Sequence, residues 1–121
     1  MTAPARLAAL AAKIELDPAA LATARAAGDA LADELDGRST DAAAGEAALR
    51  WRIAVIRAVI AAPPDGDAVR ELYGELVDRY RDQPVRLAAL RPLGDEIRRL
   101  EAEGTLARSL VARSDRRPHR R

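Results

Sequence analysis

Apolar residues recur along the chain at the three- and four-residue spacing of amphipathic α-helices. The regularity is clearest between Val69 and Tyr80, where nearly every i, i+3, i+4 position is apolar. No segment shows the strict alternation that is typical of a half-buried strand. The pattern predicts helices over residues 7–16, 18–36, 41–62, 68–81 and 93–104, with a short segment at 85–90 before the last one.

Helix-capping and helix-breaking residues separate these segments. Asp, Ser and Thr side chains accept hydrogen bonds at a helix start, proline fits the first turn, and glycine ends a helix readily. The expected boundary residues are Asp17-Pro18, Gly37, Ser39 or Thr40, Pro63-Pro64, Asp65-Gly66-Asp67 with Asp67 as cap, Gln83-Pro84 and Gly104. Inside the second helix, Gly28 indicates either close approach of another helix or a glycine that is merely tolerated.

The composition predicts a thin core. Of 121 residues 49% are hydrophobic, but phenylalanine is absent and aromatic residues make up 2%, so alanine must supply much of the packing. A chain this short forms one domain or two small modules, and burying its remaining apolar surface in a homodimer through the N-terminal helices would stabilise it. The single tryptophan, Trp51, is either a core residue or an anchor for a partner helix.

Charge is distributed unevenly. Residues 1–48 hold four basic and eight acidic side chains, whereas residues 49–121 hold sixteen and eleven. Residues 105–121 alone carry six arginines and one acid, a net charge of +5. Such a segment predicts an anionic partner for the C-terminal end, or equally a solvated basic tail.

Little in the sequence supports catalysis. There is no cysteine, and the only histidine, His119, has no neighbouring nucleophile or metal-ligand partner. Asp65 and Asp67 flank a glycine and fit a turn better than a paired-carboxylate site. We therefore expect no enzyme activity, cofactor, metal or small-molecule substrate. The most apolar run, residues 53–64, contains Arg57 and is too short to span a membrane, so we expect a cytoplasmic protein without a membrane partner.

The order of elements after Leu49 suggests a DNA-binding fold. A long apolar helix, an amphipathic helix, a short turn, a helix ending at Gly104 and a basic hairpin are the parts of a winged helix, which places one helix in the major groove. We expect a mainly α protein whose N-terminal helices (residues 1–48) pack on a C-terminal winged helix-turn-helix (residues 49–121) with a short β-wing. The expected DNA-contacting residues are Arg91, Arg98, Arg99, Arg108, Arg113, Arg116, Arg117 and Arg120.

The second half also resembles a known family. The stretch AVRELYGELVDRYRDQPVRLAALRPLGDEIRRLEAEGTLARSLVARSDRR is similar to the C-terminal winged-helix domain of archaeal Orc1/Cdc6-type replication-initiation proteins, over about residues 49–117. The matching positions are Tyr73, Tyr80, Leu100-Glu101-x-x-Gly104, Leu110, Val111 and Arg113. The resemblance implies origin-DNA binding through a recognition helix and wing. The sequence departs from the family at two places: SDRRP replaces the glycine-rich wing tip, and Pro92 replaces a basic residue of the recognition helix. The Leu-Glu-x-x-Gly ending also occurs in MarR-type regulators. The chain contains no ATPase motif.

A second resemblance covers about residues 16–50. This alanine-rich stretch, with Gly37-Arg38-Ser39 between two helical segments, is similar to part of a cyclin-like repeat of archaeal transcription factor B. That resemblance implies binding of DNA or of an initiation partner.

Together these observations predict a non-catalytic module that binds double-stranded DNA in replication initiation or transcription regulation. The alternative is a helical protein–protein adaptor or dimerisation module that docks through the Trp51 helix and carries a disordered basic C-terminal tail.

Overall fold

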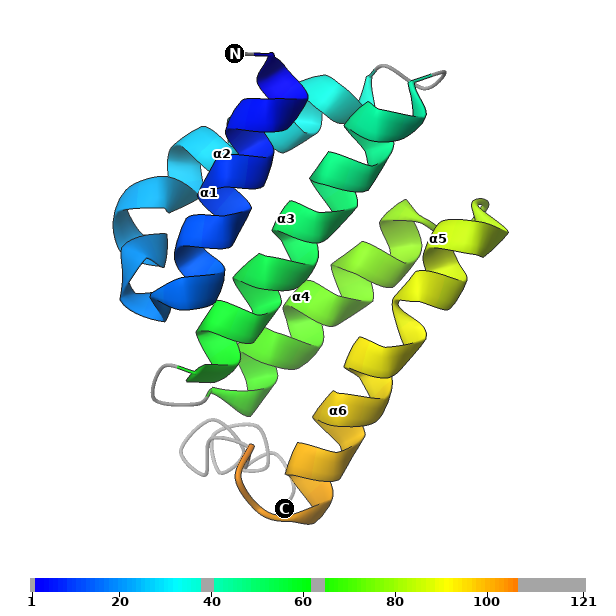
Figure 1. Ribbon diagram of the computed structural model, residues 1–121. Helices are drawn as coiled ribbons and strands as arrows, with labels where there is room; N and C mark the ends of the chain where they lie inside the picture. The colour runs from blue at the N-terminus through cyan, green and yellow to red at the C-terminus, as the bar shows by residue number, and fades with distance from the viewer. Residues whose placement is uncertain (1, 38–40, 62–64, 107–121) are drawn as a thin grey trace, which may run out of the picture. The chain divides into compact units, whose positions relative to one another are not determined.

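All regular elements that the structure describes are helices (Figure 1). The computed structural model describes residues 2–37, 41–61 and 65–106. They contain α1 (Ala3–Leu16), the 3-10 helix η1 (Pro18–Ala20), α2 (Leu21–Asp36), α3 (Ala42–Ala61), α4 (Gly66–Arg79), α5 (Pro84–Ala89) and α6 (Arg91–Ala102). The mainly α class is confirmed, and these residues contain no strand. Of the expected wing, residues 105–121, all but the first two residues lie outside them.

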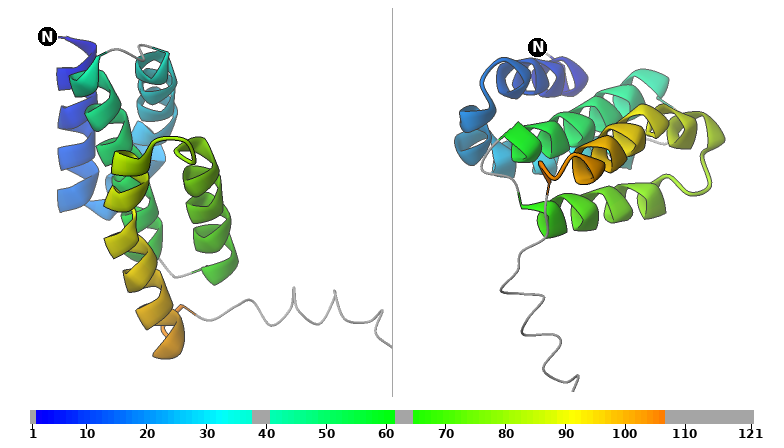
Figure 2. Two further views of the ribbon diagram at one scale, coloured as in Figure 1. Left: turned by 90° about the vertical axis from the view of Figure 1, so that its right-hand side faces the viewer. Right: turned by 90° about the horizontal axis from the view of Figure 1, so that it is seen from below.

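The chain divides into two compact units, residues 1–62 (unit 1) and 63–121 (unit 2). The boundary expected between residues 48 and 49 falls inside α3, because this helix packs along both α1 and α2 over most of its length. Figures 1 and 2 show the helices of unit 1 running side by side.

Short polar side chains start the helices of unit 1. The hydroxyl of Thr2 accepts from the Ala5 amide at 3.2 Å, and the Asp17 carboxylate accepts from the Ala19 amide at the same distance. At the start of α3, Asp41 accepts from the Ala44 amide at 3.2 Å. The expected caps Ser39 and Thr40 lie outside the described residues, so Asp41 is the cap that the structure establishes for α3.

The face of α3 that packs on α1 and α2 is not the face richest in large aliphatic residues. The sequence groups Leu49, Ile53, Ile56 and Ile60, yet none of them belongs to the core cluster of unit 1. That cluster consists of Leu7, Ala11 and Ile14 of α1, Ala24, Ala32 and Leu35 of α2, and Ala44, Ala48, Trp51, Ala54 and Val55 of α3. Alanines allow close helix contact, and one tryptophan fills the remaining space.

Close approach of α2 to α3 is made possible by Gly28. A Cβ atom at this position would lie 2.0 Å from Cζ2 of Trp51, far inside van der Waals contact. The six-membered ring of the indole therefore lies directly against the α2 backbone. Of the two interpretations of Gly28 that the sequence left open, the structure shows close approach, and it places Trp51 in the core of unit 1, with no exposed surface.

Unit 2 is a helical hairpin in which α5 and α6 return alongside α4 (Figure 2). Its first helix is capped by Asp65, whose carboxylate accepts from the amides of Asp67 and Ala68 at 3.1 and 3.2 Å. Asp67, expected as the cap, instead lies in the first turn and pairs with Arg70 at 2.9 Å. The same arginine also pairs with Glu101 of α6, so one side chain ties both arms of the hairpin.

The connection between α4 and α6 differs from that of a helix-turn-helix. That motif joins its helices by a turn of three or four residues. Here the connecting segment contains the helix α5, and Leu90 alone separates α5 from α6.

The helix end expected at Gly104 is confirmed. This glycine has φ +82°, which side-chain-bearing residues rarely adopt, and the following Leu106 amide donates to the Leu100 carbonyl at 3.3 Å.

Candidate functional site

The expected recognition-helix arginines lie exposed on α6, close to acidic side chains. Arg98 pairs with Asp95, and Arg99 lies 3.5 Å from Glu103. Each of these two arginines is thus close to an acid three or four residues away along the chain. Arg91 is exposed at the start of the helix. His119 lies outside the described residues. So do the remaining DNA-contact candidates, Arg108, Arg113, Arg116, Arg117 and Arg120.

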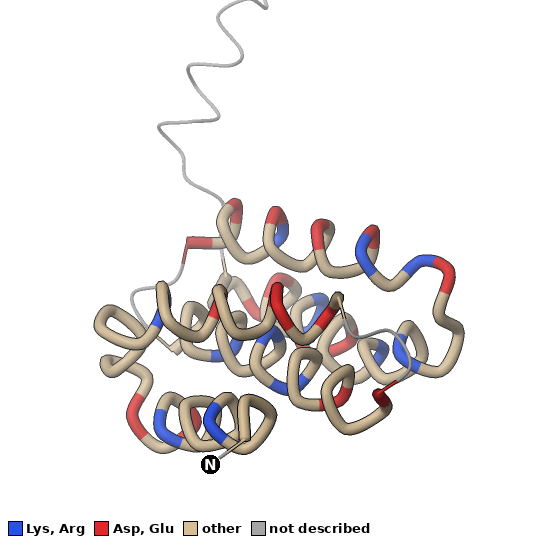
Figure 3. The backbone as a smooth tube through the Cα atoms, turned by 90° about the horizontal axis from the view of Figure 1, so that it is seen from above, with Lys and Arg blue, Asp and Glu red and all other residues tan. Residues whose placement is uncertain are grey.

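The described part of unit 2 carries no excess of positive charge. Helix α6 holds three arginines and three acids, and residues 65–106 hold seven basic and ten acidic side chains, a net charge of −3. Figure 3 shows both signs interspersed along the helices. A surface of this kind repels phosphates overall, so any favourable field for a polyanion must come from residues 107–121.

Unit 1 contains a concave surface beside α3. A groove of about 630 Å³ lies between the C-terminal end of α1, η1 and one face of α3. Its lining residues are Ile14, Glu15, Pro18, Glu46, Leu49, Arg50, Ile53, Ala54, Arg57, Ala58 and Ala61. Nearly all of the uncharged ones are aliphatic. The groove thus has an apolar floor and a charged rim.

Small residues on α3 create the hollow. Ala54, Ala58 and Ala61 follow one another at helical spacing, so little side-chain volume fills the space beside α1. Pro18 begins η1, which carries the chain on towards α2 at the end of α1. Ile53 is half-buried and offers part of its side chain to the groove. The result is an open surface suited to an apolar ridge.

An ion pair fixes one rim of the groove. Arg50 donates to both carboxylate oxygens of Glu15, with Nη2–Oε1 at 2.7 Å and Nε–Oε2 at 3.1 Å. These hydrogen bonds lower the pKa of Glu15 against the opposing effect of desolvation, and the charges of Arg50 and Arg57 lower it further. The bidentate geometry orients Arg50. It also links α1 to α3 across 35 residues of sequence.

The Glu15–Arg50 pair predicts a specific pH dependence. Because the folded pKa of Glu15 lies below its unfolded value, the pair stabilises the fold above that unfolded value, near pH 4.3, and the contribution disappears as pH falls through the folded pKa. The effect is small, since both side chains are more than 40% exposed. Urea denaturation should therefore show that Glu15→Gln lowers stability slightly at pH 7 and has no effect near pH 2.5. An equal effect at both pH values would contradict the assignment.

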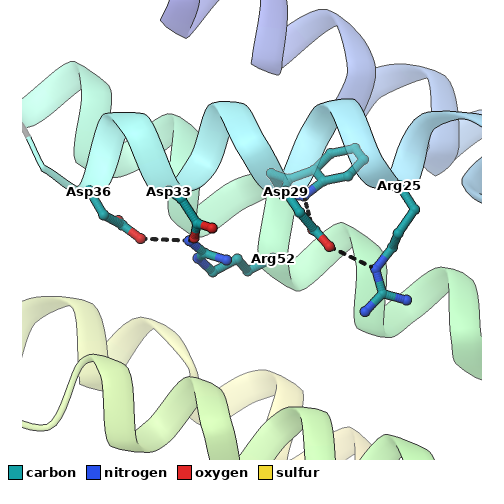
Figure 4. A network of polar contacts seen from close by, with 6 residues as sticks. Arg25, Asp29, Asp33, Asp36 and Arg52 are labelled. Atoms are coloured by element: carbon teal, nitrogen blue, oxygen red, sulfur yellow. Dashed lines mark hydrogen bonds and ion pairs between the residues drawn. The ribbon is translucent and has the colours of Figure 1, made fainter.

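A second polar network holds α3 against α2 (Figure 4). The indole N–H of Trp51 donates to Asp29 at 2.9 Å, and Arg25 donates to the other oxygen of that carboxylate at 3.1 Å. Farther along, Arg52 pairs with Asp36 at 2.6 Å and with Asp33 at 3.0 Å. These contacts fix the rotation of α3 about its axis. They therefore determine which of its residues face the groove.

Arg52 tests the strength of this network. Only 13% of its side chain is exposed, and Arg52→Gln removes its ion pairs to Asp33 and to Asp36, whose side chain is 21% exposed. We expect a loss of about 1–2 kcal/mol, which urea denaturation followed by Trp51 emission would measure. Arg81→Gln, followed by circular dichroism because Arg81 lies in unit 2, is the matched control: the Arg81–Asp78 pair is about 70% exposed on both sides and should change stability negligibly. Equal effects of the two changes would show that the network contributes nothing particular.

Comparison with known proteins found no matching family, no similar curated protein and no similar solved structure. The two resemblances described above therefore stay predictions. Among the described residues no cluster of acidic or histidine side chains could hold a metal ion, and no helix is long and apolar enough to cross a membrane.

Sequence reasoning did not identify the groove. The sequence feature that corresponds to the groove is the series Ala54, Ala58 and Ala61 on the same helix as Ile53. Other alanines of this helix line the core, and the sequence does not distinguish alanines of the groove from alanines of the core. Nor could it pair Glu15 with Arg50.

Proposed function

We propose that the chain is a non-catalytic helical protein–protein interaction module that binds through the groove of unit 1. The observation that carries this proposal is the apolar floor between α1 and α3 within a charged rim. Protein interfaces commonly combine an apolar centre with a polar border. Helices often dock in hydrophobic grooves.

The rest of unit 1 supports the same role. Trp51 and its Asp29 hydrogen bond hold α3 in place, so the groove is a preformed surface on a packed scaffold. Preformed sites avoid the entropic penalty of ordering on binding. Trp51 itself is fully buried and cannot be the docking anchor that the sequence allowed. In this proposal the contact comes from Ile53 and its neighbours.

The native size of the chain tests the proposal. In extracts of cells that make the protein, size-exclusion chromatography should place it well above the 13.0 kDa of one chain. Ile53→Asp puts a charge into the groove, and the variant chain should elute at the position of a monomer. Ala26→Asp, on the exposed surface of α2, should leave the larger species unchanged. Elution of the unaltered chain as a monomer would contradict an interaction role.

A second candidate is binding of double-stranded DNA, which the net charge of +5 in residues 105–121 favours. The winged-helix form of this hypothesis assigns contacts to Arg91, Arg98 and Arg99 as well. Since α6 is neutral overall and two of these arginines are paired with acids, we place the phosphate contacts of this candidate in the C-terminal segment.

Fluorescence anisotropy with a DNA duplex at two salt concentrations separates these assignments. Replacing Arg113, Arg116 and Arg117 with glutamine should weaken binding and reduce the salt slope by up to about 3, since each phosphate contact contributes roughly 0.9. The double change Arg98→Gln, Arg99→Gln should have little effect. No binding at low salt, or binding unchanged by the triple replacement, would exclude this candidate.

A further inference from the structure

One stripe of α3 beside the groove carries exposed charges in a self-complementary order. Glu46, Arg50, Ile53 and Arg57 follow one another at spacings of four, three and four, so they lie along one side of the helix. An acid stands at one end of this stripe and a base at the other. The four charged residues of the groove consist of two acids and two arginines, so the lining is neutral overall.

We propose that the occupant of the groove is α3 of a second copy of the chain, packed antiparallel about a two-fold axis. This inference rests on the proposed interaction function and adds the identity of the partner. If the axis passes between residues 51 and 52, Glu46 of each copy lies opposite Arg57 of the second copy.

Arg50 fits this register as well. It lies opposite Ile53 of the second copy, and its guanidinium is already neutralised by two hydrogen bonds to Glu15 of its own chain. Its aliphatic stem can therefore cover the isoleucine without burying an unpaired charge. The two intermolecular ion pairs would stand about 16 Å apart along α3, one on each side of the apolar contact.

Charge order selects this arrangement over its alternatives. Parallel packing in register would place Glu46 against Glu46 and Arg57 against Arg57, which is unfavourable. A strongly acidic or strongly basic partner would meet like charges on a lining that contains both signs equally. The thin core gives a further reason, because unit 1 has one large aromatic side chain in 62 residues and gains stability by burying more apolar surface.

Sedimentation equilibrium of the purified full chain with paired charge reversals tests the proposal. The unaltered chain should form a dimer of twice 13.0 kDa. Glu46→Arg alone and Arg57→Glu alone should each weaken dimerisation at least about tenfold, because every substitution acts twice across the two-fold axis. The double variant restores both ion pairs with reversed polarity and should return the dimer constant to within about threefold of the original.

Matched controls separate this effect from a change in net charge or a loss of folding. Arg81→Glu and Glu75→Arg change the charge equally on exposed positions of unit 2 and should leave dimerisation unaltered. Circular dichroism checks that each variant keeps its helices. The proposal is overturned if the chain is monomeric at every concentration, if single reversals have no effect, or if the double variant fails to recover. A monomeric purified chain that is large in cell extracts would refute the second copy as partner and leave the interaction function standing.

Discussion

Replacing Trp51 with alanine is expected to lower the free energy of unfolding of unit 1 by about 3–5 kcal/mol. Trp51 is fully buried, it is the largest side chain in the core of unit 1, and the remaining core residues are Leu, Ile, Val and Ala. Its removal leaves a cavity that rigid neighbouring helices cannot close. It also removes the N–H that donates to Asp29. Since small domains are stable by about 5–15 kcal/mol, this one change should remove a large share of the total.

Urea denaturation followed by circular dichroism at 222 nm would measure the effect. Trp51→Phe is the matched control, because it keeps an aromatic ring while losing the hydrogen bond to Asp29, and it should cost about half as much or less. A loss below about 1 kcal/mol for Trp51→Ala would mean that unit 1 is not organised around this side chain.

Gly28→Ala should be the second most damaging change, with a net loss of about 2 kcal/mol. A methyl group 2.0 Å from the indole ring forces α2 away from α3, and such overpacking lowers stability by up to about 3 kcal/mol. The higher helix propensity of alanine offsets about 1 kcal/mol of this loss. Because the chain has one tryptophan, its fluorescence during urea denaturation reports on unit 1 directly. Gly74→Ala in unit 2 is the control, followed by circular dichroism: nothing lies within 4 Å of a Cβ there, so the same change should raise stability by roughly 0.5–1 kcal/mol.

A double-mutant cycle would attribute the effect to this contact. In a Trp51→Leu background the atoms that collide with the new methyl group are absent, so Gly28→Ala should become neutral or slightly stabilising when measured by circular dichroism. Additive losses from the two changes would contradict direct packing of the ring on Gly28.

Local sequence signals predicted several helix boundaries in both units. Asp17-Pro18 starts a new helix and Gly104 reverses the chain because capping and left-handed conformations depend on the residues themselves. At Gly28 the sequence left close approach and simple tolerance open, and the structure shows close approach. Even so, a local signal can point to the wrong neighbour, as when Asp65 rather than Asp67 caps α4.

The rotation of α3 could not be predicted, because it depends on contacts between distant residues. Trp51 and Asp29 are 22 residues apart, and Arg50 and Glu15 are 35 apart. In an alanine-rich helix several faces have similar hydrophobicity, so the pattern of large aliphatic residues indicated one face while Trp51 packed on another. The groove follows from that rotation, whereas the six arginines of residues 105–121 can be read directly from the sequence, so the sequence predicted a DNA-binding surface there and gave no indication of the groove.

The most direct measurement of the interaction role is photo-crosslinking from position 53 in cells that make the chain. A benzophenone amino acid there points into the groove of unit 1, and one at position 26 on α2 serves as the control. The account predicts a strong adduct from position 53, at twice 13.0 kDa if the partner is a second copy, and little or none from position 26. The absence of an intermolecular adduct from position 53, or equal adducts from both positions, would contradict it.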